Sequence, residues 1–266
     1  MNSKEITALR NVLSAAIQKA GKVVLTSRKR ISIASTSAHD LVTTADHKSD
    51  GLLIATLKNH FPKIAVYSEE SGGEKKFPKE LLAIFDGIDG TINYSSGSPI
   101  WGISGAIHEN GIPIAAAICQ PALNKFFSMT AYKTATVHRQ VSERKLSVSK
   151  KRDLETARVC TEWKKGNSEI VYDILRILFE NTMCPQIFVC CTFSIMLVAE
   201  GILDGCVASG PTPEDVAAAI PILEAAGGRV TDLDGNPYDI FSGKVMVASN
   251  GHIHKALLKT LESIRK

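Results

Sequence analysis

Two carboxylates placed directly after an apolar run constrain the fold of this chain more than any other feature of its sequence. Residues 81–85 are entirely apolar, and they continue into Asp86-Gly87-Ile88-Asp89-Gly90-Thr91. A short apolar run of this kind predicts a buried strand. Burying two anions without a cation costs several kcal/mol each. The two carboxyl groups must therefore reach the surface or share a positive ion.

Further acidic residues lie at the ends of other predicted elements. Glu69 follows the apolar run 64–67, Asp46 ends the segment 40–46, and Asp215 stands at the start of a predicted helix. A lone pair of aspartates in a turn is usually a surface feature. Several acids at element ends, with no Lys or Arg beside them, instead suit hard divalent cations that prefer oxygen ligands.

The periodicity of the chain predicts an α+β protein in two halves that pack as one compact body. Residues 1–144 read as an α+β half, with a helix over 4–29, a second helix after Asp46 and an antiparallel meander over 101–130. Residues 145–266 read as an α/β half. Its predicted strands are 157–162, 187–191, 205–209, 229–232 and 244–248, and its predicted helices are 168–180, 193–204, 213–226 and 252–264.

Composition excludes several classes of protein. The net charge of +4 and the aromatic content of 6% give no basic, aromatic-rich surface for a nucleic acid polymer. The apolar runs are too short for a membrane span, and the first residues do not read as a secretory signal. The six cysteines contain no CxxC pair, so we expect reduced thiols and a cytoplasmic protein.

Four motifs, taken in order, resemble those of the inositol monophosphatase superfamily. Residues 40–46 are similar to its D-x-V-T-x-x-D segment, and Glu69-Glu70-Ser71 to its G-E-E-S. Residues 86–91 resemble D-P-I-D-G-T, and residues 215–228 resemble its W-D-x-A-A and E-A-G-G pair. The correspondence covers nearly the whole chain.

The resemblance implies a five-layer α-β-α-β-α sandwich that assembles as a homodimer. It also implies a Mg²⁺-dependent, lithium-sensitive phosphomonoesterase with two or three metal ions. Such an enzyme hydrolyses a small phosphorylated metabolite, with inositol monophosphate as the default, by direct attack of a metal-activated water.

The resemblance also assigns roles to residues of this sequence. The implied metal ligands are Glu69, Asp86, the backbone carbonyl of Ile88, Asp89 and Asp215. The implied catalytic residues are Glu69, Thr91 and Asp46, with the Thr91 hydroxyl held by Asp46. The implied phosphate and substrate contacts are Gly90, Thr91, Asp89 and Asp215.

This chain departs from the family pattern at several positions. Gly87 replaces a proline, which suggests a looser turn and weaker metal affinity, and Glu214 replaces a tryptophan. Val189-Cys190-Cys191 replaces a Gly-Ser-Ala segment, and Ala208 replaces a glutamate that contacts the inositol ring. These changes spare the metal ligands and alter the substrate pocket.

Other functions remain open on the sequence alone. A related phosphatase acting on 3′(2′),5′-bisphosphate nucleotides or sugar phosphates fits the same motifs. A haloacid-dehalogenase-type phosphatase shares an F-D…D-G-T pattern, but Asp86 and Asp89 are one residue too far apart for it. A diverged scaffold without activity would explain the altered pocket but not the retained acids.

Overall fold

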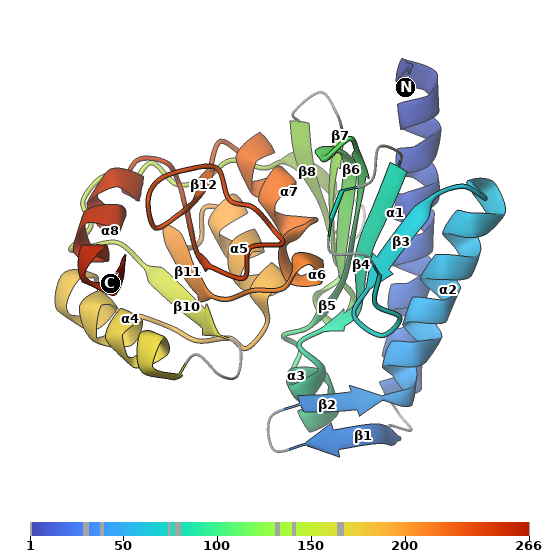
Figure 1. Ribbon diagram of the computed structural model, residues 1–266, viewed down its shortest axis with the longest axis horizontal. Helices are drawn as coiled ribbons and strands as arrows, with labels where there is room; N and C mark the ends of the chain where they lie inside the picture. Colours follow the sequence, from blue (N-terminus) through green and yellow to red (C-terminus); the bar gives the residue numbers. More distant parts are fainter. Residues whose placement is uncertain are drawn as a thin grey trace.

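Helices and strands stack in five layers, α-β-α-β-α (Figure 1). The computed structural model describes residues 2–28, 32–37, 40–73, 76–77, 81–130, 134–139, 142–163 and 168–265. The first three layers are α1 (Ser3–Ser27) and α2 (Thr44–His60), a seven-stranded sheet, and the helices α5 (Cys191–Ala199), α6 (Pro213–Val216) and α7 (Ala219–Ala225). A four-stranded sheet and the outer helices α4 (Ser168–Asn181) and α8 (His254–Thr260) complete the stack. The predicted sandwich is confirmed.

The first layer consists of two capped helices, α1 (Ser3–Ser27) and α2 (Thr44–His60). Asn2 caps α1 by accepting hydrogen bonds from the backbone N–H groups of Lys4 and Glu5. The apolar stripe of α1, spaced by three and four residues, is fully buried against the first sheet. Its members include Leu9, Leu13, Ile17 and Val24.

The seven-stranded sheet brings two acidic strand ends to one edge. Its order is β3 (Ala65–Ser68), β4 (Leu81–Asp89), β5 (Gly102–Glu109), β6 (Ile112–Gln120), β7 (Lys125–Thr130), β8 (Thr134–Arg139) and β9 (Ser142–Lys145). β3 and β4 are parallel, with Ser68 opposite Phe85. Glu69 and Asp86, each the next residue along, therefore lie at the same end of this strand pair.

The antiparallel meander predicted over 101–130 is present, and further strands that the sequence did not predict accompany it. β5, β6 and β7 form the antiparallel meander, and Asn110 and Gly111 make its first turn with positive φ angles. β1 (Ile33–Ser37) and β2 (Asp40–Thr43) pair separately below the sheet in Figure 1, and β2 runs directly into α2.

The second sheet has the order β10 (Val159–Trp163), β11 (Gly205–Ser209), β13 (Val245–Ser249) and β12 (Arg229–Asp232). β10 and β11 are parallel, so their ends lie together and face the first half. The outer helices are α4 (Ser168–Asn181), α8 (His254–Thr260) and the short η3 (Glu262–Arg265). Across the described residues, the helices lack the combination of length and apolarity that spanning a bilayer demands.

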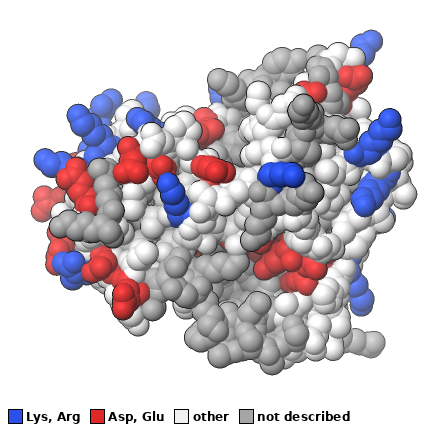
Figure 2. Space-filling model, in the orientation of Figure 1, with Lys and Arg blue, Asp and Glu red and all other residues white. Residues whose placement is uncertain are grey.

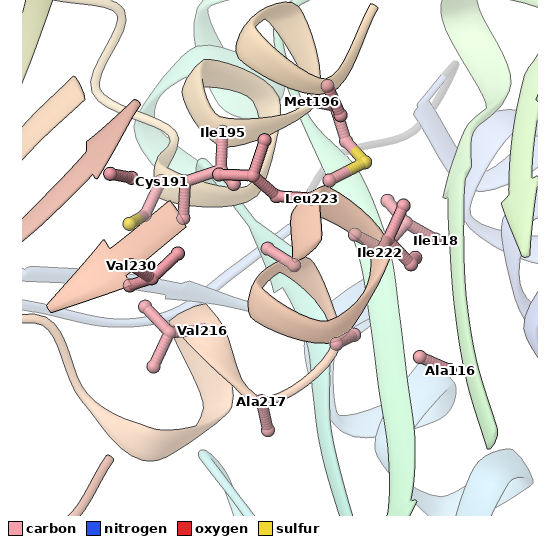
Figure 3. Packing of buried hydrophobic residues seen from close by; sticks show 14 of the residues in the cluster. Ala116, Ile118, Cys191, Ile195, Met196, Val216, Ala217, Ile222, Leu223 and Val230 are labelled. Carbon is pink, nitrogen blue, oxygen red and sulfur yellow. The ribbon is translucent and has the colours of Figure 1, made fainter. Parts of the chain in front are cut away.

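Apolar side chains between the two sheets form the central core (Figure 3). Ile118 of β6 faces Met196 of α5 (Cys191–Ala199) and Ile222 of α7 (Ala219–Ala225). Separate clusters pack beneath α1 and α2 and beneath α4 and α8. The middle helices are thus fixed from both sides, which holds the start of α5 and of α6 (Pro213–Val216) at the seam between the halves.

Two predicted elements of the second half are wrong. Residues 187–190 form a loop rather than part of a strand, and α5 begins at Cys191. The predicted helix 213–226 is split into α6 and α7. Pro221 explains the split between Val216 and Ala219. Proline has no N–H to donate to the carbonyl oxygen four residues earlier, and its ring crowds that carbonyl.

Candidate functional site

Three carboxylates from opposite halves of the chain meet at the seam. Asp86 and Asp89 lie at the end of β4, and Asp215 lies in α6. Each offers an oxygen, and these oxygens all lie within 4.8 Å of one another. Glu69, just after β3, lines the same pocket as Asp89 and Asp215. It shares a hydrogen bond with Asp86.

Two matching capping boxes orient the acids that begin helices. The Oδ2 atom of Asp215 accepts hydrogen bonds from the backbone N–H of Thr212 at 2.7 Å and from its hydroxyl at 2.6 Å. Thr43 donates in the same way to Oδ2 of Asp46, at 2.8 and 2.5 Å. One oxygen of each carboxylate is fixed by its own helix, which leaves the other for a second partner.

The two acids of β4 are also held by donors. Oδ2 of Asp89 accepts hydrogen bonds from the backbone N–H of Thr192 at 2.6 Å and from its hydroxyl at 2.5 Å. Oδ1 of Asp86 accepts from the backbone N–H of Ile88 at 2.7 Å. These hydrogen bonds fix the side chains but do not neutralise their negative charge, so a cation would be bound favourably here.

Burial and crowding raise the pKa values of the cluster. Burial, followed by the charge of Glu69, raises the pKa of Asp86 well above its ordinary range. Burial and the charge of Asp215 raise the pKa of Asp89 to about 6. Burial, followed by the charges of Asp215 and Glu214, raises the pKa of Glu69 as well. Part of this residue still contacts water at the pocket wall. In all three cases burial is the largest cause, and repulsion between ionised carboxylates adds to it.

The donor set fits a hard divalent cation. All the converging groups are carboxylate or carbonyl oxygens, the ligands that Mg²⁺ prefers. Among the described residues that line the pocket, none is Lys, Arg or His. Figure 2 shows acidic side chains gathered near the lower middle of the face, where the two halves adjoin. A bound cation would offset both the burial of these charges and their mutual repulsion.

Thr91 links the cluster to Asp46. Its hydroxyl lies 3.0 Å from Oδ1 of Asp46 and 2.9 Å from the carbonyl oxygen of Ile88. A hydroxyl has one hydrogen, so a full hydrogen bond goes to only one of these acceptors at a time. If the Ile88 carbonyl bound a cation, Asp46 would remain as the acceptor. The hydroxyl oxygen of Thr91 could then accept a hydrogen bond from water.

Gly90 and Gly87 allow close backbone approaches around this turn. Gly90 precedes α3 (Thr91–Ser96) and has a φ of +85°. A Cβ on Gly90 would lie 3.0 Å from the carbonyl oxygen of Ile100 and 3.2 Å from Cβ of Cys190. A Cβ on Gly87 would lie 3.1 Å from the carbonyl oxygen of Asp46, so glycine here lets β4 approach α2.

We expect Gly90→Ala to lower the free energy of unfolding by about 2 kcal/mol, because it adds a close contact to an unfavourable φ. Gly243→Ala is a matched control, since Gly243 has a φ of +62° but nothing within 4 Å of the added Cβ. Urea unfolding of both variants separates the two contributions. Equal losses in the two variants would contradict the close approach at Gly90.

A pocket of about 160 Å³ opens beside the acids. The altered positions singled out in the sequence, Val189, Cys190, Cys191 and Ala208, all line it. The other members of the wall carry no signal in the sequence; they include Glu162, Trp163, Ser209 and Pro211. Thr192, which donates two hydrogen bonds to Asp89, was not predicted either, because it is not the N-cap of α5 and its role depends on a contact with the other half of the chain.

Comparison with known proteins identifies the family of the chain. Residues 5–266 match the model of the inositol monophosphatase family. The chain is 28% identical over 255 residues to "Nus factor SuhB" of Vibrio cholerae, with 94% of each protein covered. It is 28% identical over 234 residues to "Inositol-1-monophosphatase" of Synechocystis, covering 84% of this chain and 77% of that protein.

A solved structure gives the same result for the fold. The inositol monophosphatase of Anabaena (Nostoc) matches with a TM-score of 0.86 and 28% identity, covering 97% of each chain. The family match spans almost every residue and includes all the acids that meet at the seam. This chain belongs to the inositol monophosphatase family and is a phosphatase.

Proposed function

We propose that this protein is a Mg²⁺-dependent phosphomonoesterase that hydrolyses a small phosphorylated metabolite by direct attack of water. The observation that carries the proposal is the meeting of Asp86, Asp89 and Asp215 within 4.8 Å. With Glu69 and the Ile88 carbonyl, these groups would hold two or three Mg²⁺ ions. Bound Mg²⁺ would lower the pKa of water and neutralise charge on the transferring phosphoryl group and its leaving oxygen.

The residues of the chain supply position and proton contacts. Asp46 holds the Thr91 hydroxyl, which orients the attacking water by accepting one of its hydrogens. The backbone N–H groups of Gly90 and Thr91 lie at the start of α3, where they would donate to phosphate oxygens. Asp89 and Asp215 line the pocket that the substrate would enter. No covalent phosphoenzyme is needed in this scheme.

Phosphate release tests the proposal. The purified protein is assayed with inositol monophosphates, 3′(2′),5′-bisphosphate nucleotides and sugar phosphates, in Mg²⁺ and again in excess EDTA. We expect release only with Mg²⁺, and inositol monophosphate is the default substrate. No release from any substrate, together with no Mg²⁺ binding by calorimetry, would favour an inactive scaffold. An aspartyl-phosphate trapped on Asp86 would favour a covalent mechanism instead.

Thr91→Ala is expected to lower kcat about 100-fold, because the variant loses the group that orients water. KM should change much less, since the backbone N–H groups remain. Thr91→Ser keeps a hydroxyl and should recover most of the rate. Steady-state kinetics of both variants provide the measurement. A rate for Thr91→Ala near that of the wild type would remove Thr91 from the mechanism.

Lithium inhibition is part of the same proposal, because Li⁺ would compete for a Mg²⁺ position. Inhibition should be relieved as the Mg²⁺ concentration rises. An enzyme insensitive to lithium would indicate an altered second metal position, where Gly87 and Glu214 depart from the family pattern.

We also propose that the protein is a cytoplasmic homodimer. All six cysteines are free thiols, as a reducing compartment requires. Tyr172 and Phe179, seven residues apart on one face of α4, are 72% and 66% exposed. Exposed aromatic side chains on one helix face are typical of an interface. Sedimentation should give a dimer, and Phe179→Glu should shift it toward monomer.

A further inference from the structure

Glu162 is a buried carboxylate that the proposed reaction leaves unused. It lies in β10, is 4% exposed and lines the pocket. Its Oε1 atom accepts hydrogen bonds from the Ser194 hydroxyl at 2.6 Å and from the backbone N–H of Phe188 at 3.0 Å. The backbone of Cys190 donates to Glu162 as well. These donors lie in the first turn of α5 or in the loop just before it, so Glu162 anchors this segment to β10.

The first turn of α5 is also where Asp89 is held. The backbone N–H and the hydroxyl of Thr192 both donate to Oδ2 of Asp89, at 2.6 and 2.5 Å. The Cys190 thiol lies 3.5 Å from the backbone carbonyl oxygen of Asp89. Both contacts from Thr192 end on one oxygen of the carboxylate, so they set the direction in which the other oxygen points. The position of this proposed metal ligand therefore depends on where the first turn of α5 lies.

Carboxylates from the two halves of the chain thus bind the same helical turn. Asp89 belongs to β4 and Glu162 to β10, and their partners Thr192 and Ser194 are two residues apart in α5. The N–H groups at the start of a helix attract negative charge, which favours both contacts. Hydrogen bonds that orient a metal ligand matter for the metal, because removing them typically weakens metal affinity by about 10- to 100-fold.

The loop before α5 is also held from the side of α3, in a conformation that it would not adopt alone. Val189 has a φ of +57°, in the left-handed region that a β-branched residue rarely adopts. The side-chain amide of Asn93 donates to the carbonyl oxygens of Phe188 at 2.7 Å and Val189 at 3.1 Å. A strained residue persists only where its surroundings impose the conformation. Without the Glu162 contacts, the loop and the first turn of α5 should therefore relax.

We propose that Glu162 is a positioning residue for the metal ligand Asp89. Glu162 fixes the first turn of α5, and Thr192 of that turn fixes the carboxylate that binds Mg²⁺. The inference rests on the proposed metal-dependent function and concerns a residue that does not itself bind the metal. Changes at Glu162 should weaken Mg²⁺ binding through Thr192.

Calorimetric titration of the whole protein with Mg²⁺ alone tests this path of contacts. Glu162→Ala should raise the Kd for Mg²⁺ about tenfold. Glu162→Gln keeps an acceptor oxygen for Ser194 and Phe188, so it should retain most of the affinity. Burial raises the pKa of Glu162 to about 7, so the titrations are run at pH 8, where this carboxylate is ionised. Equal losses in the two variants would show that the charge of Glu162 acts directly on the cation, and would overturn the positioning role.

Thr161→Val is the matched control. Thr161 is the neighbouring residue of β10 and is fully buried, and its hydroxyl donates to the carbonyl oxygen of Val207 at 2.9 Å. The variant loses a buried hydrogen bond of the same strand, but not one of those that hold α5. Its Kd for Mg²⁺ should stay within about twofold of the wild-type value. A tenfold loss here would mean that any damage to β10 weakens the metal site, which contradicts a specific role for Glu162.

Thermodynamic coupling tests whether Glu162 acts through Thr192. Thr192→Val removes the hydroxyl contact with Asp89 and should also raise the Kd about tenfold. Along a single path the two effects overlap, so the double variant should lose far less than the roughly hundredfold expected of independent effects. A hundredfold loss would overturn the path through Thr192. Ser194→Ala removes a single donor to Glu162 and should weaken binding by a smaller factor. An affinity of Ser194→Ala equal to that of the wild type would contradict the anchoring, even if Glu162→Ala did not fold.

Amide hydrogen exchange gives a readout that needs neither metal nor substrate. In the metal-free protein, a peptide spanning residues 186–195 should exchange faster in Glu162→Ala than in the wild type, because its anchor to β10 is lost. The same peptide should be unchanged in Thr161→Val. Equal exchange in Glu162→Ala and the wild type would contradict the anchoring of α5.

Steady-state kinetics separate positioning from substrate binding. At saturating Mg²⁺, Glu162→Ala should recover most of its kcat, and its KM should change little. A raised KM with an unchanged Kd for Mg²⁺ would make Glu162 a substrate contact and overturn the inference. Equal Mg²⁺ binding by Glu162→Ala and the wild type would overturn this inference alone. A wild-type protein that neither binds Mg²⁺ nor releases phosphate would overturn the proposed function itself.

Discussion

Asp89→Asn is expected to lower Mg²⁺-dependent phosphate release by at least about 10³-fold while the protein stays folded. Asp89 is 6% exposed and belongs to the trio whose oxygens meet within 4.8 Å. An amide keeps the shape of the side chain, and its carbonyl oxygen still accepts from Thr192. The variant loses one negative charge where the cation is held.

The stability of the metal-free variant distinguishes a metal ligand from a structural residue. Removing one charge from a repelling cluster should leave metal-free Asp89→Asn at least as stable as the metal-free wild type. The rise in Tm on adding Mg²⁺ should largely disappear. Glu169→Gln, an exposed acid at the start of α4, should behave like the wild type in both assays. Near-normal kcat in Asp89→Asn would contradict the site.

The second large effect is the dependence of Mg²⁺ stabilisation on pH. The pKa of Asp89 is raised from 3.8 to about 6 in the metal-free protein. A carboxylate with a raised pKa is protonated, and does not repel its neighbours, below that value. As pH rises through about 6, the metal-free fold loses stability, and the ionised carboxylates become available to Mg²⁺.

Mg²⁺ should therefore raise Tm by about 5 °C near pH 8, for a concentration about a hundredfold above Kd. The rise should be small near pH 5. The buried His108 and His254, whose pKa values are lowered to about 4, destabilise the fold as pH falls below 6.5. This loss occurs with and without Mg²⁺, so it cancels in the difference between paired thermal scans. A rise in Tm on adding Mg²⁺ that does not depend on pH would contradict binding by the carboxylates whose pKa values are raised.

The position of the acids could be predicted from the sequence because it follows from strand ends. An apolar run followed by Asp86 predicts a buried strand with its carboxylate toward the C-terminal end. The parallel pairing of β3 and β4 then brings Glu69 to the same end. The link between Thr91 and Asp46 likewise followed from the family motifs, and the 3.0 Å contact fits it.

The pocket wall could not be predicted in the same way, because distant contacts decide it. Residues 187–191 are mostly apolar and read as a strand, yet Asn93 and Glu162 hold residues 188–190 as a loop. Glu162 and Trp163 are the last residues of β10, and nothing in the sequence of this strand predicts that they line a pocket. The pairing of Trp163 with Ser209 joins residues 46 positions apart.

Anomalous diffraction from a crystal soaked in Mn²⁺, a stand-in for Mg²⁺, tests the central claim most directly. We expect at least one strong peak about 2.0–2.3 Å from oxygens of Asp86, Asp89 and Asp215, and no such peak in Asp89→Asn. A structure whose Mn²⁺ peaks all lie away from these three carboxylates would contradict the account.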